Sequence, residues 1–120
     1  QDRVHLLGPK FHAEVLALYA EYDVFVLCSI TEGMPIVIME AMRAGIPVIA
    51  SAIAAIPELV GEGGLLVPAE DPTALATAIL QCTQGEVDVA TLTQRAQERI
   101  ATHFDLDTNT QRFRDFLVNR

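Results

Sequence analysis

The fold of this chain is decided by one stretch, VFVLCSITEGMPIVIMEAMRAGIPVIAS, which spans residues 24–51. It opens with the apolar run VFVLC (24–28) and closes with the apolar run PVIA (47–50) before Ser51. Between these runs lies a helix-like segment, 35–45, that Gly45 ends. Because both runs are apolar on both faces, they suit parallel strands covered by helices on each side. The stretch therefore predicts a strand–helix–strand unit.

The same alternation continues outward along the chain. Further strands are predicted at 4–8 and 64–68, and a short helix at 56–60. Longer helices are predicted at 11–22, 71–83, 89–104 and 108–119. This order predicts an α/β fold with a Rossmann-like parallel sheet and flanking helices. In such sheets ligands bind beyond the carboxyl ends of the strands.

Composition and charge exclude several classes of function. The chain has 120 residues, of which 51% are hydrophobic, so it suits one soluble domain with a modest core. Its net charge is −8 and it has no basic cluster, which disfavours a nucleic acid partner. Cys28 and Cys82 lie far apart without a C-x-x-C motif, which fits either a reducing compartment or two ordinary buried thiols. A cytoplasmic location is therefore the default expectation. No apolar run reaches the roughly 18 residues of a transmembrane segment. Any peripheral membrane contact is expected to be made through a longer parent protein.

Other chemistry-bearing residues point to no separate site. His5, His12 and His103 show no metal-ligand spacing with the cysteines or acids, so neither a metal nor a cofactor is expected. Ser51 lacks the G-x-S-x-G context of a nucleophile, which disfavours a hydrolase. Glu58 is assigned to a short helix or a domain interface in preference to catalysis.

The segment EGMPIVIME (32–40) carries the sharpest local signal. Pro35 suits the first turn of a helix, which leaves Met34 as the cap residue. A methionine side chain cannot accept bonds from the free amides of that turn. The chain reaches this start through Gly33, and the N–H groups there, with their partial positive charge, offer a seat for phosphate. We therefore expect an open helix start that binds phosphate.

Two glutamates, Glu32 and Glu40, flank this helix start. Glu40 lies about five residues inside the helix, roughly 7–8 Å from its start, and its side chain leans back toward it. Because a carboxylate repels phosphate, its natural partners are neutral hydroxyls, such as those of a ribose. Glu32, in the loop, would face a second hydroxyl-bearing group across the phosphate.

Each glutamate also has a simpler interpretation. In this interpretation the Glu40 side chain simply extends from its helix to solvent. One acidic residue in an apolar helix is weak evidence for a site. Ser29 and Glu32 would form a capping box. Gly33 and Pro35 disfavour the capping box, because they interrupt any helix that begins at Ser29.

The stretch SITEGMPIVIMEAMRAGIPVIAS (29–51) resembles the signature of retaining nucleotide-sugar glycosyltransferases of the GT-B type, also called glycosyl transferases group 1 or family 4. VHLLG, LYAEYDVFVLCS, IPELV and GGLLVPAEDPTALATAI follow in the family's order and spacing, so the resemblance covers nearly the whole chain. It implies the C-terminal, donor-binding domain of an enzyme that transfers a hexose from a nucleotide diphosphate sugar to an acceptor.

The resemblance also implies roles for individual residues. Glu40 would bind the ribose of the donor nucleotide. Glu32 would be the catalytic residue, contacting the transferred sugar and stabilising positive charge near its anomeric carbon. Backbone groups around the helix start would hold the sugar and the diphosphate, at Gly33, Met34, Pro35, Ile36 and Val37.

The chain departs from the family in two respects. Family members usually have a glycine pair in place of Ala54 and Ala55, and a positive φ would cost alanine roughly 1–2 kcal/mol per residue. The family's C-terminal domain also begins with a strand, an arginine and a lysine that hold the diphosphate, and a second strand, none of which precedes Gln1. Residues 1–120 are therefore interpreted as a partial donor-binding domain that lacks the acceptor domain and is inactive alone.

These departures lead to two further expectations. Without the family's first two strands, either residues 4–8 pair directly with residues 24–28, or strand edges stay unpaired and recruit another chain. An alternative function also stays open, that of a non-catalytic α/β module that binds a nucleotide or a protein.

Overall fold

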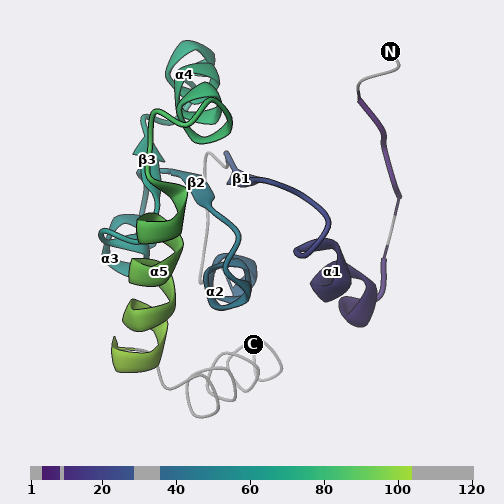
Figure 1. Ribbon diagram of the computed structural model, residues 1–120. Coiled ribbons are helices and arrows are strands. Elements are labelled where there is room, and N and C mark those ends of the chain that lie inside the picture. Colours follow the sequence, from purple (N-terminus) through teal and green to yellow (C-terminus); the bar gives the residue numbers. More distant parts are fainter. Residues whose placement is uncertain (1–3, 9, 29–35, 104–120) are drawn as a thin grey trace.

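The computed structural model describes residues 4–8, 10–28 and 36–103 (Figure 1). Its elements are α1 (His12–Leu18), β1 (Phe25–Leu27), α2 (Ile36–Ala44), β2 (Val48–Ser51), α3 (Ile56–Val60), β3 (Leu65–Val67), α4 (Pro72–Thr83) and α5 (Val89–His103). The predicted α/β fold is confirmed, and so are the predicted strand–helix–strand units from residue 24 to residue 68. The predicted helix at 108–119 lies outside the described residues.

The three strands form one parallel sheet in the order β1-β2-β3. Its register pairs Val26 with Ile49 and Ala50 with Leu66. All four residues of β2 are buried. The strand predicted from its two apolar faces is therefore the centre of the described sheet, and its carboxyl end lies between those of β1 and β3.

Residues of β2 alternate between two helical layers. Val48 and Ala50 are fully buried in a core cluster that includes residues of α2, α3 and α5. Ile49 is fully buried in a second cluster, with Ala78 and Cys82 of α4. This period of two is the geometry of an extended strand. Accordingly, Figure 1 shows α4 on the other side of the strands from α2, α3 and α5.

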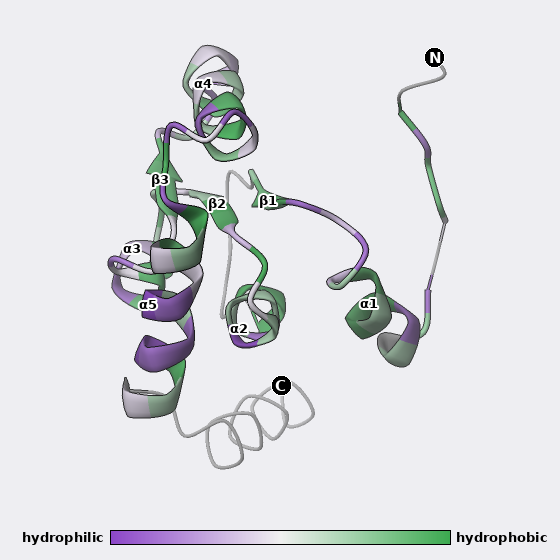
Figure 2. Cartoon of the chain, viewed as in Figure 1, coloured by the Kyte–Doolittle hydropathy of each residue, from purple (hydrophilic) through white to green (hydrophobic). Residues whose placement is uncertain are grey.

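The helices α2 and α5 pack together through apolar stripes. The buried residues of α2 are Ile38, Met39, Ala41 and Met42. Ala96 and Ile100 of α5, four residues apart, lie in the same core cluster. Figure 2 shows hydrophobic residues along α2 and the strands, whereas much of α5 is hydrophilic, as expected of a helix that buries one face.

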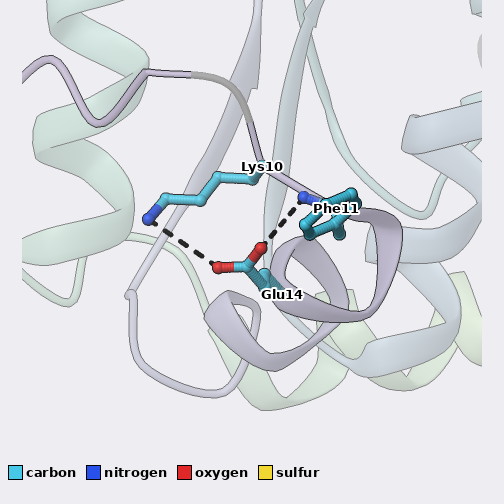
Figure 3. Close-up of polar contacts among 3 residues, drawn as sticks. All are labelled: Lys10, Phe11 and Glu14. Atoms are coloured by element: carbon cyan, nitrogen blue, oxygen red, sulfur yellow. Dashed lines mark hydrogen bonds and ion pairs between the residues drawn. The ribbon is translucent and has the colours of Figure 1, made fainter.

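The start of α1 is fixed by a local contact (Figure 3). The backbone N–H of Phe11 donates a 3.1 Å hydrogen bond to the Glu14 carboxylate, which satisfies one free amide near the helix start. Lys10 lies 4.0 Å from the other carboxylate oxygen. This exposed ion pair contributes little to stability. The helix ends at Leu18, earlier than the predicted residue 22, because the chain then forms the shorter-range bond from Glu21 N–H to the Leu18 carbonyl.

The predicted strand at 4–8 is wrong. These residues have no regular secondary structure, and Leu6 is 96% exposed. A strand needs a neighbouring backbone to pair with, and within the described part of the chain the outer edge of β1 pairs with no strand. The direct pairing of 4–8 with 24–28 therefore does not occur. Recruitment of another chain to the free edge stays a prediction.

The described ranges also bear on membrane and metal binding. No helix among the described residues is long and apolar enough to cross a membrane. Those residues also contain no group of three or more histidine, cysteine, aspartate or glutamate side chains arranged to hold a metal ion.

Candidate functional site

The carboxyl ends of the three strands define the edge where a ligand is expected. The strands β1, β2 and β3 end at Leu27, Ser51 and Val67. Four of the predicted site residues, Glu32, Gly33, Met34 and Pro35, fall between β1 and α2 and lie outside the described residues. Their roles therefore stay predictions, as does the capping-box alternative for Ser29 and Glu32.

The start of α2 carries the other two predicted backbone positions. Ile36 is the first residue of the helix, and Val37 follows with a 40% exposed side chain. N–H groups in the first turn of a helix have no carbonyl partner inside the helix. The structure thus brings Ile36 and Val37 to the first turn, where the sequence predicted phosphate contacts.

Glu40 lies in the second turn of α2. Its side chain is half-buried, between the buried residues Met39 and Ala41 of the same helix. Burial raises the pKa of the neighbouring Tyr19 hydroxyl, and the negative charge of Glu40 raises it further. The Glu40 carboxylate is therefore close enough to act on the Tyr19 phenol. Glu40 is the fifth residue of α2, which agrees with the predicted position about five residues inside the helix.

Tyr19 is a residue of this region to which the sequence assigned no role in the site. It is 8% exposed and its ring meets the Phe25 ring edge-on, with centroids 5.9 Å apart. Its hydroxyl donates to the Val37 carbonyl over 3.5 Å. The available signal was the residue type, because a buried tyrosine needs a partner for its hydroxyl whereas leucine or phenylalanine does not.

Ser51 joins the ends of β1 and β2. It is 2% exposed, and its hydroxyl donates to the Leu27 carbonyl over 3.5 Å. This contact crosses between neighbouring strands at the carboxyl edge of the sheet. Ser51 is therefore placed to hold the end of β1, and thus the point where the chain leaves for residues 29–35.

The turn after β2 lies at the same edge. The Ala52 N–H donates to the Val67 carbonyl over 2.8 Å, which ties the turn to β3. Ala54 has φ +49°, whereas Ala55 has φ −86°. Of the two alanines that replace the family's glycine pair, only Ala54 therefore adopts the conformation that disfavours a side chain.

Glu58 lies in the first turn of α3 with an exposed side chain. This places it on the predicted short helix. The helix α3 contributes Ile56, Leu59 and Val60 to the core.

Comparison with known proteins shows which family has this arrangement. The family described as glycosyl transferases group 1 matches residues 1–84, well over half of the 120 residues. The chain belongs to the glycosyl transferases group 1 family. The resemblance of residues 29–51 to that family's signature is thereby confirmed.

This group 1 chain has curated relatives that are much longer. It is 38% identical over 113 residues to the amylovoran biosynthesis glycosyltransferase AmsK of Erwinia amylovora. That alignment covers 88% of this chain but 28% of the relative. The chain therefore spans less than a third of the length of this relative.

Solved structures confirm the fold. Anabaena HepE, solved in complex with UDP and glucose, matches 100% of the group 1 chain and 33% of its own, with a TM-score of 0.82 and 32% identity. The C-terminal domain of the group 1 protein LpcC from Francisella tularensis matches 84% of this chain and 52% of its own, with a TM-score of 0.71 and 22% identity. The likeness to LpcC shows the fold alone, which is that of a GT-B C-terminal domain.

Proposed function

We propose that this chain is the donor-binding part of a retaining GT-B glycosyltransferase that transfers a hexose from a nucleotide diphosphate sugar to an acceptor. The observation that carries the proposal is the match to HepE. Its complex with UDP-glucose has a TM-score of 0.75 and 31% identity over 92% of this chain. The separate acceptor domain would belong to the same longer protein, so residues 1–120 alone would bind donor weakly and transfer no sugar.

The geometry of α2 supports this proposal. The helix begins beyond the carboxyl end of β1, where its first-turn amides would hold the diphosphate. Glu40 lies four residues after Ile36, a rise of about 6 Å along the helix axis. A carboxylate at that distance avoids the phosphates and accepts hydrogen bonds from the ribose hydroxyls. Its half-buried position limits competition from water.

Glu32 would act on the sugar in the same proposal. As the bond from the anomeric carbon to the diphosphate breaks, positive charge develops on the sugar ring and negative charge on the leaving phosphate. The Glu32 carboxylate would stabilise the first charge and the α2 amides the second. Both interactions strengthen in the transition state, which is the condition for catalysis.

The binding role is tested at Glu40 in the complete protein. Glu40→Ala should weaken nucleotide-sugar binding by about 1–3 kcal/mol, because charge-assisted hydrogen bonds to the ribose are lost. Calorimetric titration with a panel of sugar nucleotides measures this change. Glu62→Ala is the matched control, since it removes the same charge from an exposed residue beyond α3. Equal affinity of wild type and Glu40→Ala for the best donor would remove Glu40 from the site.

The catalytic role is tested at Glu32. Glu32→Gln should lower kcat more than it raises KM, because the carboxylate acts mainly on transition-state charge. Steady-state kinetics of the complete enzyme with its best donor give both constants. A change in KM alone would limit Glu32 to holding the ground-state sugar. If the complete wild-type protein bound the donor but transferred no sugar, the result would favour the non-catalytic alternative. The replacement of the family's glycine pair by Ala54 and Ala55 also points to that alternative.

A further inference from the structure

The helix α5 holds the C-terminal ends of two other helices through its side chains. The Gln97 amide donates to the Arg43 carbonyl of α2 over 3.1 Å. The Arg99 guanidinium donates from Nε to the Leu59 carbonyl of α3 over 2.9 Å and from Nη2 to the Glu58 carbonyl. The last carbonyls of a helix have no partner inside it, so these side chains satisfy groups that need one. Bonds from a charged guanidinium are among the stronger ones.

The chain around α3 is built to admit this arginine. Gly61, the residue that ends α3, has φ +53°. A β-carbon on Gly61 would lie 2.5 Å from Cζ of Arg99, and one on Gly63 would lie 2.6 Å from Cα of Ala96. Two glycines therefore let α5 approach closely at this corner. We call Arg99, Gly61 and the Glu58 and Leu59 carbonyls the α3 clasp.

The α3 clasp helps to position α3, a helix that is too short to be stable alone. With five residues, α3 is far shorter than a helix that is stable alone. Its position comes from the packing of the buried Ile56, Leu59 and Val60 and from the α3 clasp at its C-terminal end. Because only residues 52–55 separate α3 from the carboxyl end of β2, any shift of α3 moves that turn.

We infer that Arg99 is a positioning residue for the donor site, acting through α3 on the turn at residues 52–55. This inference rests on the proposed function, because it takes the carboxyl edge of the sheet to be the donor-binding edge. Arg99 itself contacts the opposite end of α3 from this turn and would not touch the donor. The turn is tied to β3 by the 2.8 Å bond from the Ala52 N–H to the Val67 carbonyl. It is joined to α3 by the 3.0 Å bond from the Ile56 N–H to the Ile53 carbonyl, so the α3 clasp acts on the turn through α3.

Two measurements on the complete protein test this inference. In Arg99→Ala, the backbone amides of residues 52–60 should exchange with deuterium faster, and the Kd for the sugar nucleotide that wild type binds best should rise about 3- to 30-fold, because small displacements of binding groups lose affinity. Arg99→Lys should fall between wild type and Arg99→Ala in both, since lysine keeps the charge but cannot bridge two carbonyls with a planar fork. If Arg99→Ala does not fold, Arg99→Lys carries the test.

Two controls separate positioning from loss of charge or stability. Arg95→Ala removes the same charge one turn earlier on α5, from a residue that makes no hydrogen bond to α3 among the described contacts. Asp88→Ala removes the side chain that accepts the Thr91 N–H at the start of α5, and so weakens the same helix at its other end. Both controls should leave Kd and the exchange of residues 52–60 unchanged at a temperature where every variant is folded.

The remaining outcomes distinguish failure of the inference about Arg99 from failure of the proposed function. Donor binding by wild type with the same Kd in Arg99→Ala would overturn the inference and leave the proposed function standing. An equal loss of affinity in Asp88→Ala would also overturn it, since general destabilisation of α5 would then explain the effect. A folded wild type that binds no sugar nucleotide would overturn the proposed function, and the role assigned to Arg99 would fall with it.

Discussion

Residues 4–8 and residues 48–51 have similar apolar sequences but opposite fates in the structure. The second segment is β2, paired on both edges and buried at every position. The first has no regular secondary structure, and Val4, Leu6 and Leu7 are all exposed. An apolar run therefore indicates that a segment can form a buried strand, whereas pairing depends on a neighbour elsewhere in the chain. β2 has such neighbours in β1 and β3.

The largest expected effect comes from shortening one apolar side chain in each segment. Ile49→Ala should lower the free energy of unfolding by about 2–5 kcal/mol, because the Ile49 side chain of β2 is fully buried against α4. Leu6→Ala should change it by less than about 0.5 kcal/mol, since Leu6 is almost fully exposed. Urea denaturation measures both values. A large effect of Leu6→Ala would mean that residues 4–8 are covered in solution, and a mass that rises with concentration would identify a second copy as the cover.

The second test compares Gly8, in the unpaired segment, with Gly63, which precedes β3 and lies against α5. Gly63→Ala should lower the free energy of unfolding by about 1–3 kcal/mol, because the new β-carbon would overlap the α5 backbone at Ala96. Gly8 has a positive φ, but nothing lies within 4 Å of the position that a β-carbon would take there. Gly8→Ala should cost less than about 1 kcal/mol, because an unpaired segment can relax away from the strain. Thermal unfolding checks this order, and equal shifts in Tm would contradict it.

A smaller and opposite effect is expected at the carboxyl end of β2. Ala54→Gly should raise the free energy of unfolding by about 1 kcal/mol, since it relieves a positive φ at an alanine. Ala55→Gly is the matched control: its φ is −86°, so glycine should destabilise by about 0.5–1 kcal/mol. Urea denaturation measures the free energy of unfolding of both variants. Stabilisation by Ala55→Gly would show that the turn differs from the one described.

The smallest expected effect concerns Tyr19, which packs the N-terminal region onto α2. Burial and the charge of Glu40 raise the pKa of Tyr19, so the folded state holds the phenol proton more tightly than the unfolded state does. This contribution to stability is complete below the unfolded pKa of about 10 and is lost as pH rises through the raised folded pKa. Tyr19→Phe should therefore flatten the fall in stability as pH rises above about 10. An unchanged alkaline slope would place the hydroxyl in water.

Sequence reasoning found what depends on local pattern and missed what depends on distant partners. The strands β1, β2 and β3 and the helices α2 to α5 follow from apolar periodicity, Pro72 and Gly45. The strand at 4–8 was wrong because its pairing was not encoded locally. The bonds of Tyr19 to Val37 and of Arg99 to Leu59 join residues 18 and 40 positions apart, and neither had a sequence signal beyond residue type.

The described part of the candidate site was predicted in a similar way. Ile36 and Val37 lie in the first turn, and Glu40 in the second turn, of a helix that follows β1, as the spacing of prolines, glycines and apolar residues indicated. The departure at Ala54 and Ala55 was also recognised, but only the structure distinguishes the strained alanine from the relaxed one. A backbone angle at one turn residue depends on how β3 and α3 hold the two ends of the turn, and single-sequence patterns do not contain that information.

The contacts of α5 also set the order in which this protein takes shape during synthesis. A ribosome releases β1, α2, β2 and α3 well before Gln97 and Arg99 emerge, and chains begin to fold as they appear. Until those two residues are available, the Arg43, Glu58 and Leu59 carbonyls have only water as a partner in place of α5. The helices α2 and α3 therefore gain these bonds only when the chain has grown past residue 99.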